Sequence, residues 1–228
     1  MKKKVIFEDL GRIRYKSAWD YQEKLFEQVI SEKLNKNEKK DQYLLFCEHE
    51  HVYTLGKRGD KHNLLITRHL CESKNIDLHA IDRGGDITYH GPGQLVAYPI
   101  IDLEAFGTGV KSYISMLEDV VIEVLKTYGI EGEKDNKAMG VWIDAGIPEK
   151  ARKICAIGVR ASRYVTMHGL ALNINTDLTY FSYINPCGFT DRGVTSMQKE
   201  IGKEVDFGEA SGRMKIAFSD VFGMEFTS

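Results

Sequence analysis

One cysteine of the chain stands in a segment that is typical of a turn. In YINPCGFTDRGVTSM (183–197), Cys187 lies between Pro186 and Gly188, and both of these neighbours favour turns over regular strands or helices. A turn exposes its side chains, and an exposed thiol becomes a nucleophile when a nearby cation lowers its pKa. We therefore expect Cys187 to carry nucleophilic chemistry.

A lysine stands inside the apolar segment ARKICAIGV (151–159). In an extended strand, Lys153, Cys155 and Ile157 point to one side. Burying a lysine is costly unless it is paired or neutral. Lys153 therefore either reaches water from a strand end or is held near an acidic partner or a thiol. Because Cys155 shares this predicted face, it is a rival of Cys187 for the nucleophile.

The spacing of the cysteines argues against a metal site. Cys47, Cys71, Cys155 and Cys187 are widely separated and form no CxxC pair, so neither a zinc ribbon or finger nor a dithiol redox motif is expected. Cys47 lies in an apolar strand run and Cys71 in a short polar stretch. Both are interpreted as packed thiols, and no metal is expected.

Glycine-rich backbone surrounds a histidine in RGGDITYHGPGQLVAYPI (83–100). Gly84 and Gly85 allow another backbone or a ligand to come close, and 91–93 (GPG) predicts a turn between two strands. In the strand between these turns, Thr88 and His90 share one face. Two interpretations stay open, a hairpin with a satisfied histidine or a ligand site. Neither a GxGxxG fingerprint nor a GxxxxGK[ST] loop is present.

Hydrophobic spacing predicts an α+β fold around these segments. We expect helices at 17–34, 110–128 and 208–223, and strands at 43–47, 51–55, 75–81, 138–144, 151–159 and 165–175. The short connections among the last three strands favour antiparallel neighbours. The result is a mixed, largely antiparallel sheet flanked by helices, in a single domain spanning 1–228.

Composition excludes several classes of function. The formal net charge of −2 gives no basic field for nucleic acid. No apolar run approaches the length that crosses a bilayer, and MKKKVIFEDLG has no apolar signal region after its lysines. We therefore expect a cytoplasmic protein that binds neither nucleic acid nor membrane.

Five blocks of the chain, in order, resemble the lipoyl(octanoyl) transferases, the octanoyl-acyl-carrier-protein:protein N-octanoyltransferases. They are CEHEHVYTLGKRG (47–59), RGGDITYHGPGQLVAYPI (83–100), KICAIGVR (153–160), HGLALNIN (168–175) and INPCGFTDRGVTSM (184–197). The resemblance extends from about residue 10 to 222. It implies the fold of the biotin and lipoate protein ligases.

The resemblance also implies the site residues. Cys187 matches the family's nucleophile and Lys153 its partner lysine. The substrate-binding residues implied in this way are Arg83, Gly84, Gly85, Asp86, Ile87, Thr88, Tyr89, His90, Ala156, Ile157, Gly158, Gly169, Leu170 and Ala171. Two positions depart from the family pattern. Glu50 stands where relatives usually have proline, and Cys155 where they usually have a small apolar residue.

The implied reaction moves octanoyl from the thioester of acyl carrier protein to a lysine of a lipoyl domain, through a Cys187 thioester. The acceptors would be the lipoyl domains of 2-oxoacid dehydrogenases and the glycine cleavage H protein. The chain would be a monomer without a cofactor of its own. Carrier proteins are acidic, so a basic rim is expected from Lys57, Arg58, Lys61, Arg152 and Arg160.

Three alternatives stay open from the sequence. An ATP-dependent lipoate–protein ligase on the same fold would need no cysteine. A cysteine amidase or thioesterase would pair its thiol with a histidine, for which His90 and His168 are available. A module that only binds lipoyl domains would need neither Lys153 nor Cys187.

Overall fold

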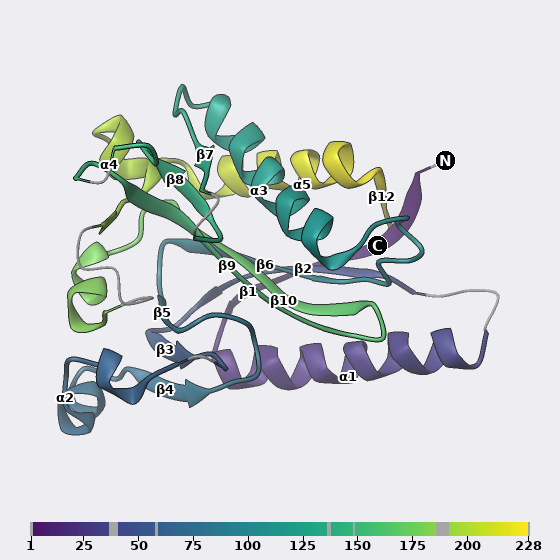
Figure 1. Cartoon of the computed structure of the whole chain (residues 1–228), viewed down its shortest axis with the longest axis horizontal. Coiled ribbons are helices and arrows are strands. Elements are labelled where there is room, and N and C mark those ends of the chain that lie inside the picture. Colours follow the sequence, from purple (N-terminus) through teal and green to yellow (C-terminus); the bar gives the residue numbers. More distant parts are fainter. Residues whose placement is uncertain are drawn as a thin grey trace.

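A large mixed sheet runs through the middle of the protein (Figure 1). The computed structural model describes residues 2–36, 41–57, 59–135, 138–147, 149–185 and 192–227. Within them the sheet has the order β12-β1-β2-β6-β10-β9-β8-β7, with β11 beside β9. Its strands are β1 (Lys3–Ile13), β2 (Tyr43–His49), β6 (Gln94–Ile100), β7 (Glu133–Lys134), β8 (Val141–Ile143), β9 (Arg152–Ser162), β10 (Val165–Asn173), β11 (Gly193–Val194) and β12 (Met224–Thr227).

Helices cover both faces of this sheet (Figure 1). Helices α3 (Val110–Lys126) and α5 (Phe207–Phe222) pack on one face, and α1 (Tyr15–Leu34) packs on the other. The α3 side of the core is formed by a helical stripe that includes Leu117, Val121 and Val124, all buried. The apolar spacing therefore predicted this helix correctly. It ends at Lys126, just before Gly129, which has a φ of +71°.

A second, smaller sheet lies beside the N-terminal end of α1 (Figure 1). It has the order β4-β3-β5, from β3 (Val52–Leu55), β4 (Asp77–Ala80) and β5 (Ile87–His90). Short helices accompany it and the chain that follows: η1 (Lys61–Asn63), α2 (Arg68–Ser73), η2 (Leu178–Tyr183) and α4 (Met197–Ile201). Its core is formed by a cluster of buried rings and aliphatic chains that includes Tyr53 and Tyr89.

The hairpin interpretation of 83–100 is wrong. Strand β5 pairs with β3, whereas β6 pairs with β2 and β10. The turn at 91–93 thus leads the chain from the small sheet into the large one. The core explains this choice, because Tyr89 packs in the cluster of the small sheet, whereas Leu95 and Ala97 pack beneath α3 and α5. Spacing alone could not show which neighbour each strand would find.

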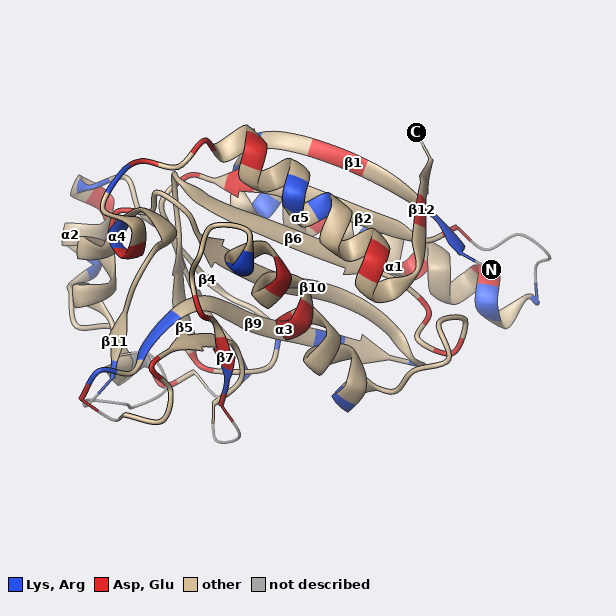
Figure 2. Cartoon of the chain, turned by 90° about the horizontal axis from the view of Figure 1, so that it is seen from above, with Lys and Arg blue, Asp and Glu red and all other residues tan. Residues whose placement is uncertain are grey.

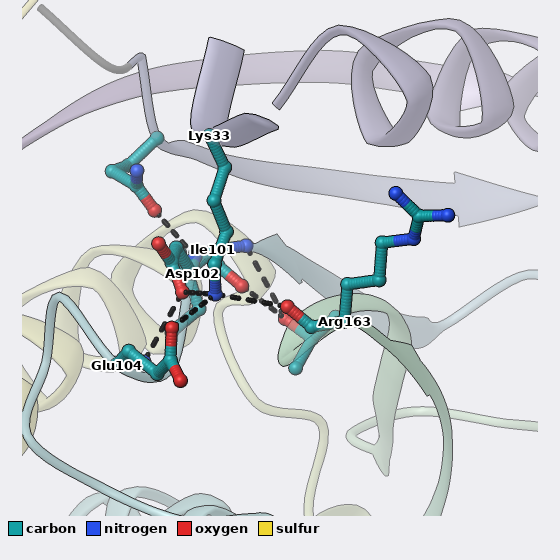
Figure 3. A network of polar contacts seen from close by, with 7 residues as sticks. Lys33, Ile101, Asp102, Glu104 and Arg163 are labelled. Atoms are coloured by element: carbon teal, nitrogen blue, oxygen red, sulfur yellow. Dashed lines mark hydrogen bonds and ion pairs between the residues drawn. The ribbon is translucent and has the colours of Figure 1, made fainter. Parts of the chain in front are cut away.

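An ion-pair network around the buried Asp102 connects the C-terminal end of α1 to the large sheet (Figure 3). The Lys33 ammonium donates to Asp102 Oδ1 at 2.6 Å, to Glu104 Oε2 at 2.7 Å and to the Arg163 carbonyl at 2.9 Å. Asp102 is 2 % exposed, and its backbone N–H donates to Oε1 of Gln42. Burial opposes charge on Lys33, but its bonds to the two carboxylates outweigh burial and raise its pKa.

Charged residues of both signs are interspersed over the helices and loops (Figure 2). Strands β6 and β10, in the middle of the large sheet, carry neither sign. None of the helices in the described part of the chain has the length and apolar character that a membrane span requires.

Candidate active site

A cavity of about 630 Å³ lies between the two sheets. Its floor is formed by β6, β10 and β9 on the same face that α1 packs against, where the helix does not cover the sheet, and β5 with the preceding loop also lines it. Lys153 and twelve of the fourteen predicted substrate-binding residues line it. The twelve are Arg83, Gly85, Asp86, Ile87, Thr88, His90, Ala156, Ile157, Gly158, Gly169, Leu170 and Ala171. Three segments that are distant in sequence therefore meet at one site.

Two of the predicted residues do not line the cavity. Gly84 is part of the wall's backbone, and its N–H donates to the Val159 carbonyl at 3.0 Å. Tyr89 is fully buried on the far side of β5. Its hydroxyl lies 2.7 Å from Nδ1 of His51, and its ring stacks on Tyr180. Strand alternation accounts for Tyr89, because Thr88 and His90 take the cavity face.

Cys187 lies outside the described residues, so the structure gives no geometry for the predicted nucleophile. The described residues nearest to it in the chain are Asn185 and Arg192. Asn185 N–H donates to the Asn63 carbonyl at 2.8 Å. Arg192 lines the cavity, and β11, which follows it, pairs in parallel with β9 so that Val194 stands beside Lys153.

Lys153 and Cys155 do not share a strand face, and that prediction is wrong. Cys155 pairs with Val141 and Lys153 pairs with Trp142, so β9 has one extra residue, Ile154, at this point. Because Val141 and Trp142 are consecutive, they point to opposite faces, and their partners do so too. Lys153 lines the cavity, while Cys155 faces α3.

Burial makes the described thiols poor nucleophiles. Cys155 is fully buried, does not line the cavity and has its pKa raised to about 12 by desolvation. Cys47 and Cys71 are also buried, and burial raises the pKa of each. This removes the argument for Cys155 as a rival of Cys187.

Close packing explains two glycines of the floor. A Cβ on Gly169 would lie 2.1 Å from the Ala97 carbonyl oxygen, so β6 and β10 can approach closely here. A Cβ on Gly158 would lie 3.0 Å from Cδ of Arg83. The Arg83 guanidinium crosses above this glycine and donates to the Thr54 carbonyl at 2.7 Å. These contacts account for both glycines without a ligand.

His90 is held by a chain of side-chain amides. Its Nδ1 lies 2.7 Å from Oε1 of Gln94, whose Nε2 donates to Oδ1 of Asn173 at 2.8 Å. Asn173 in turn donates to the Thr195 carbonyl. Burial, followed by the nearby His49, lowers the pKa of His90 to about 3. His90 is therefore neutral, with its proton on Nδ1 and an acceptor at Nε2.

The structure adds a second histidine that was not predicted as a binding residue. His168 lines the cavity, is 1 % exposed and has a φ of +59° within β10. Its Nε2 lies 3.1 Å from Oδ1 of Asp82, and its buried Nδ1 has no hydrogen-bond partner among the described residues. A strained, left-handed residue that faces a cavity is a feature of binding sites. The sequence signal was its place directly before Gly169.

Several further lining residues also escaped the sequence reasoning, since each stands in an ordinary apolar or polar pattern. They are Tyr15, Gln94, Val96, Tyr98, Ala138, Met139, Trp142, Asn173, Phe181, Arg192, Gly193 and Val194.

Acidic partners neutralise two members of the predicted basic rim. Arg152 pairs with Glu200 at 2.6 Å, and it also pairs with Asp144. Arg160 pairs with Asp82 at 2.5 Å. Lys57 is exposed, while Arg58 and the side chain of Lys61 lie outside the described residues. The two arginines therefore stabilise the fold beside the cavity and are not unpaired docking charges.

The site thus combines an apolar floor with one amine. Val96, Ala156 and Ala171 supply methyl surface, and Lys153 lines the same cavity, as does Met139, which is 40 % exposed. Such a site accommodates an apolar chain that carries a polar reacting group at its open end.

Solved structures with this fold come from the protein ligases of lipoate and biotin. A bipartite lipoate protein ligase from Thermoplasma acidophilum superposes with a TM-score of 0.72 at 15% identity, covering 99% of this chain and 86% of that one. Lipoate-protein ligase A bound with ATP gives 0.68 at 15% identity, over 100% and 88%. Biotin protein ligase from Aquifex aeolicus gives 0.52 at 14% identity, over 97% and 71%. The predicted fold class is confirmed.

The sequence comparisons place the chain within this class. The family model of the lipoyl protein ligase A/B catalytic domain matches residues 14–219. An octanoyltransferase from Parabacteroides distasonis is 51% identical over 216 residues, 95% of this chain and 97% of its own length. One from Porphyromonas gingivalis is 53% identical over 217 residues, 95% of this chain and 44% of its own length.

The chain belongs to the lipoyl protein ligase A/B catalytic domain family, and within it to the octanoyltransferases. The resemblance seen in the five sequence blocks is confirmed, and with it the expectation of an acyltransferase.

Proposed function

We propose that this protein moves an octanoyl group from octanoyl-acyl carrier protein to a lysine of lipoyl domains, through a thioester on Cys187. Octanoyltransferases that are 51% and 53% identical to it support octanoyl as the group transferred. The archaeal lipoylation system of similar fold comprises a lipoate protein ligase and its E2 lipoyl domain, which supports a lipoyl domain as acceptor.

The observation that carries the proposal is the position of Lys153 in the cavity. Its ammonium stands at one end of a floor that continues along β9 to Gly158, about 16 Å away at the rise of an extended strand. An octanoyl chain laid on this floor with its carbonyl carbon near Lys153 would extend along β9 in the direction of Gly158. The amine then lies where bonds to that carbonyl form and break.

The first step would transfer octanoyl to the enzyme. The Cys187 thiol loses its proton to the Lys153 amine, or is stabilised as a thiolate by the ammonium. The thiolate attacks the octanoyl carbonyl, the carbon–sulfur bond to the phosphopantetheine arm breaks, and the carrier's sulfur leaves as a thiolate that takes up a proton. One thioester replaces another, so little driving force is needed.

The second step would transfer octanoyl to the acceptor lysine. Its amine attacks the Cys187 thioester, an amide bond forms, and the carbon–sulfur bond to Cys187 breaks. Neutral Lys153 can accept the proton that the attacking amine loses. Thioester-to-amide transfer runs downhill and consumes no ATP. Lipoyl domains of 2-oxoacid dehydrogenases and the glycine cleavage H protein are the proposed acceptors, and a cytoplasmic monomer the proposed state.

Intact-protein mass spectrometry tests this proposal. The protein is mixed with octanoyl-acyl carrier protein in the absence of ATP, as wild type, Cys187→Ser and Cys155→Ala. We expect wild type and Cys155→Ala to gain one octanoyl group that hydroxylamine removes, and Cys187→Ser to gain none. Labelling that requires Cys155 would overturn the assignment. Loading that needs ATP and free lipoate, and survives loss of Cys187, would show a ligase instead.

A further inference from the structure

The ring of Trp142 lies directly against the Lys153 ammonium. The two residues are cross-strand partners in the β8–β9 pair, and Nζ of Lys153 is 4.7 Å from the centre of the indole ring. This is the distance at which the negative face of an indole attracts a cation. The extra residue at Ile154 creates the pair, because it turns Lys153 to the face of Trp142.

Trp142 is itself fixed in place. It is 2 % exposed, and its Nε1–H donates to the Ala138 carbonyl at 2.9 Å. Burial and this hydrogen bond therefore fix the orientation of the indole ring. The stem of Lys153 is confined as well. It passes close to Gly140, where a Cβ would lie at contact distance, 3.5 Å, from Cδ and Cε of Lys153 and would clash with the Cys155 carbonyl oxygen at 2.4 Å.

A second cation approaches the same ring. Cζ of Arg192 lies 5.1 Å from the Trp142 ring centre, and Arg192 pairs with Asp135. Arg192 and Asp135 are both close to fully buried. The carboxylate of Glu118 accepts the Gly140 N–H at 3.2 Å. Asp135 and Glu118 are thus two acidic groups that lie close to Arg192 and Gly140.

We propose that Trp142 is a positioning residue for Lys153, holding its ammonium over the indole face at the reacting end of the cavity. The inference rests on the proposed function, since it concerns the amine that the function uses. Trp142 acts through Lys153 and not on the acyl group. The same ring also lies next to Arg192, so Trp142 contacts two cations.

Fluorinated tryptophan tests the electrostatic role without changing the size of the side chain. The chain has two tryptophans, so a Trp19→Phe background leaves Trp142 as the single site for biosynthetic incorporation of mono- to tetrafluorotryptophan. Each fluorine withdraws electron density from the ring face. We expect the single-turnover rate of octanoyl transfer to fall stepwise, by about three- to tenfold for the most fluorinated ring, with the melting temperature unchanged.

A second measurement follows the Lys153 amine without any turnover. Acetic anhydride labels neutral amines, and peptide mass spectrometry quantifies acetylated Lys153 as a function of pH. We expect the pH of half-labelling to fall by about half to one unit as the ring is fluorinated or replaced by leucine. Asp135 and Glu118 are present in every variant, so they cancel from this difference.

The two measurements separate the inference from the proposed function. A fall in half-labelling pH with no octanoyl transfer in wild type would uphold the Trp142–Lys153 pair and refute the function. Octanoyl transfer that is insensitive to fluorination, with an unchanged labelling curve, would refute the pair and leave the function standing. If Trp142→Leu lost activity and had a lower melting temperature while the pH of half-labelling of Lys153 stayed unchanged, this result would also count against the inference.

Discussion

His90 donates its Nδ1–H to Oε1 of Gln94 over 2.7 Å. The orientation of the Gln94 amide is set independently, because its Nε2 donates to Oδ1 of Asn173 and to the Tyr89 carbonyl. Oε1 is therefore the atom that faces His90. A neutral imidazole that donates through Nδ1 has its lone pair on Nε2, so His90 offers the cavity an acceptor and not a cation.

This relationship predicts a fixed tautomer. Nitrogen-detected NMR should show the His90 proton on Nδ1, with no protonation of the ring above about pH 5. Gln94→Leu removes the acceptor and leaves a buried donor unpaired, so the tautomers should mix and octanoyl transfer should fall about tenfold. Titration of His90 near its ordinary pKa in the wild type would contradict the assigned network.

Two buried histidines predict how stability depends on pH. Burial lowers the pKa of His49 to about 4, and burial with the nearby His49 lowers that of His90 to about 3. Both values lie below the 6.5 of an ordinary histidine, so the unfolded chain binds more protons at acidic pH. The contribution of these two histidines to the free energy of unfolding should therefore be fully present above pH 6.5. Below pH 6.5 the free energy of unfolding should fall by about 1.4 kcal/mol per pH unit for each histidine.

Urea unfolding at a series of pH values measures this slope. His49→Gln should reduce the slope between pH 6.5 and about 4 by the share of one histidine. Gly212→Ala in α5, which has open space around it and removes no titratable group, provides the control and should leave the slope as it is. An identical slope in His49→Gln and wild type would show that His49 is not held neutral.

The close approach of β6 and β10 predicts the effect of a single methyl group. In Gly169→Ala the new Cβ would meet the Ala97 carbonyl oxygen at 2.1 Å and Cδ of Pro99 at 2.9 Å. The strands must separate, and we expect a loss of about 3 kcal/mol or more in the free energy of unfolding. Gly212→Ala, in α5 with open space around it, should instead stabilise by about 0.5 to 1 kcal/mol. Chemical denaturation compares the two, and equal effects would refute the packing argument.

The Lys33 network predicts a difference between buried and exposed ion pairs. Lys33→Met leaves the buried Asp102 carboxylate without its main cation, and we expect a loss of about 3 to 5 kcal/mol in unfolding free energy. Lys16→Met removes the exposed pair with Asp20 and should change stability by less than about 0.5 kcal/mol. Thermal and urea unfolding at low and high salt measure the change in unfolding free energy of each variant. A comparable small effect at both lysines would show that Asp102 finds other partners.

Local patterns predicted the long elements well. The helical spacing at 110–128 and the strand patterns at 151–159 and 165–175 correspond to α3, β9 and β10, because α3 buries one helical stripe and the two strands carry apolar runs into the core. Pairing between distant segments was not predictable in the same way. Strand β5 left its chain neighbour β6 and joined β3, since Tyr89 packs into the small sheet's core.

In the site, too, local features were predictable from the sequence and contacts between distant segments were not. The types and order of the residues in three glycine-containing segments were enough to predict which segments surround a cavity, because their motifs resemble those of a known family. Sequence spacing failed at Ile154, where one extra residue turned Lys153 away from Cys155 and toward Trp142. Sequence reasoning named His168 only as a possible partner of a hydrolytic thiol and not as a binding residue, because the position of His168 at the cavity depends on a left-handed backbone conformation inside a strand.

By itself, the sequence determined the family, the fold class and the candidate reacting groups, since apolar periodicity and motif identity are local properties of the chain. The tertiary structure alone decided that Cys155 is buried, that Arg152 and Arg160 are paired with carboxylates, and that the Lys153 ammonium lies over an indole ring. Burial, ion pairing and cross-strand register arise from contacts between residues far apart in sequence, and these contacts set the charge and reactivity of each group.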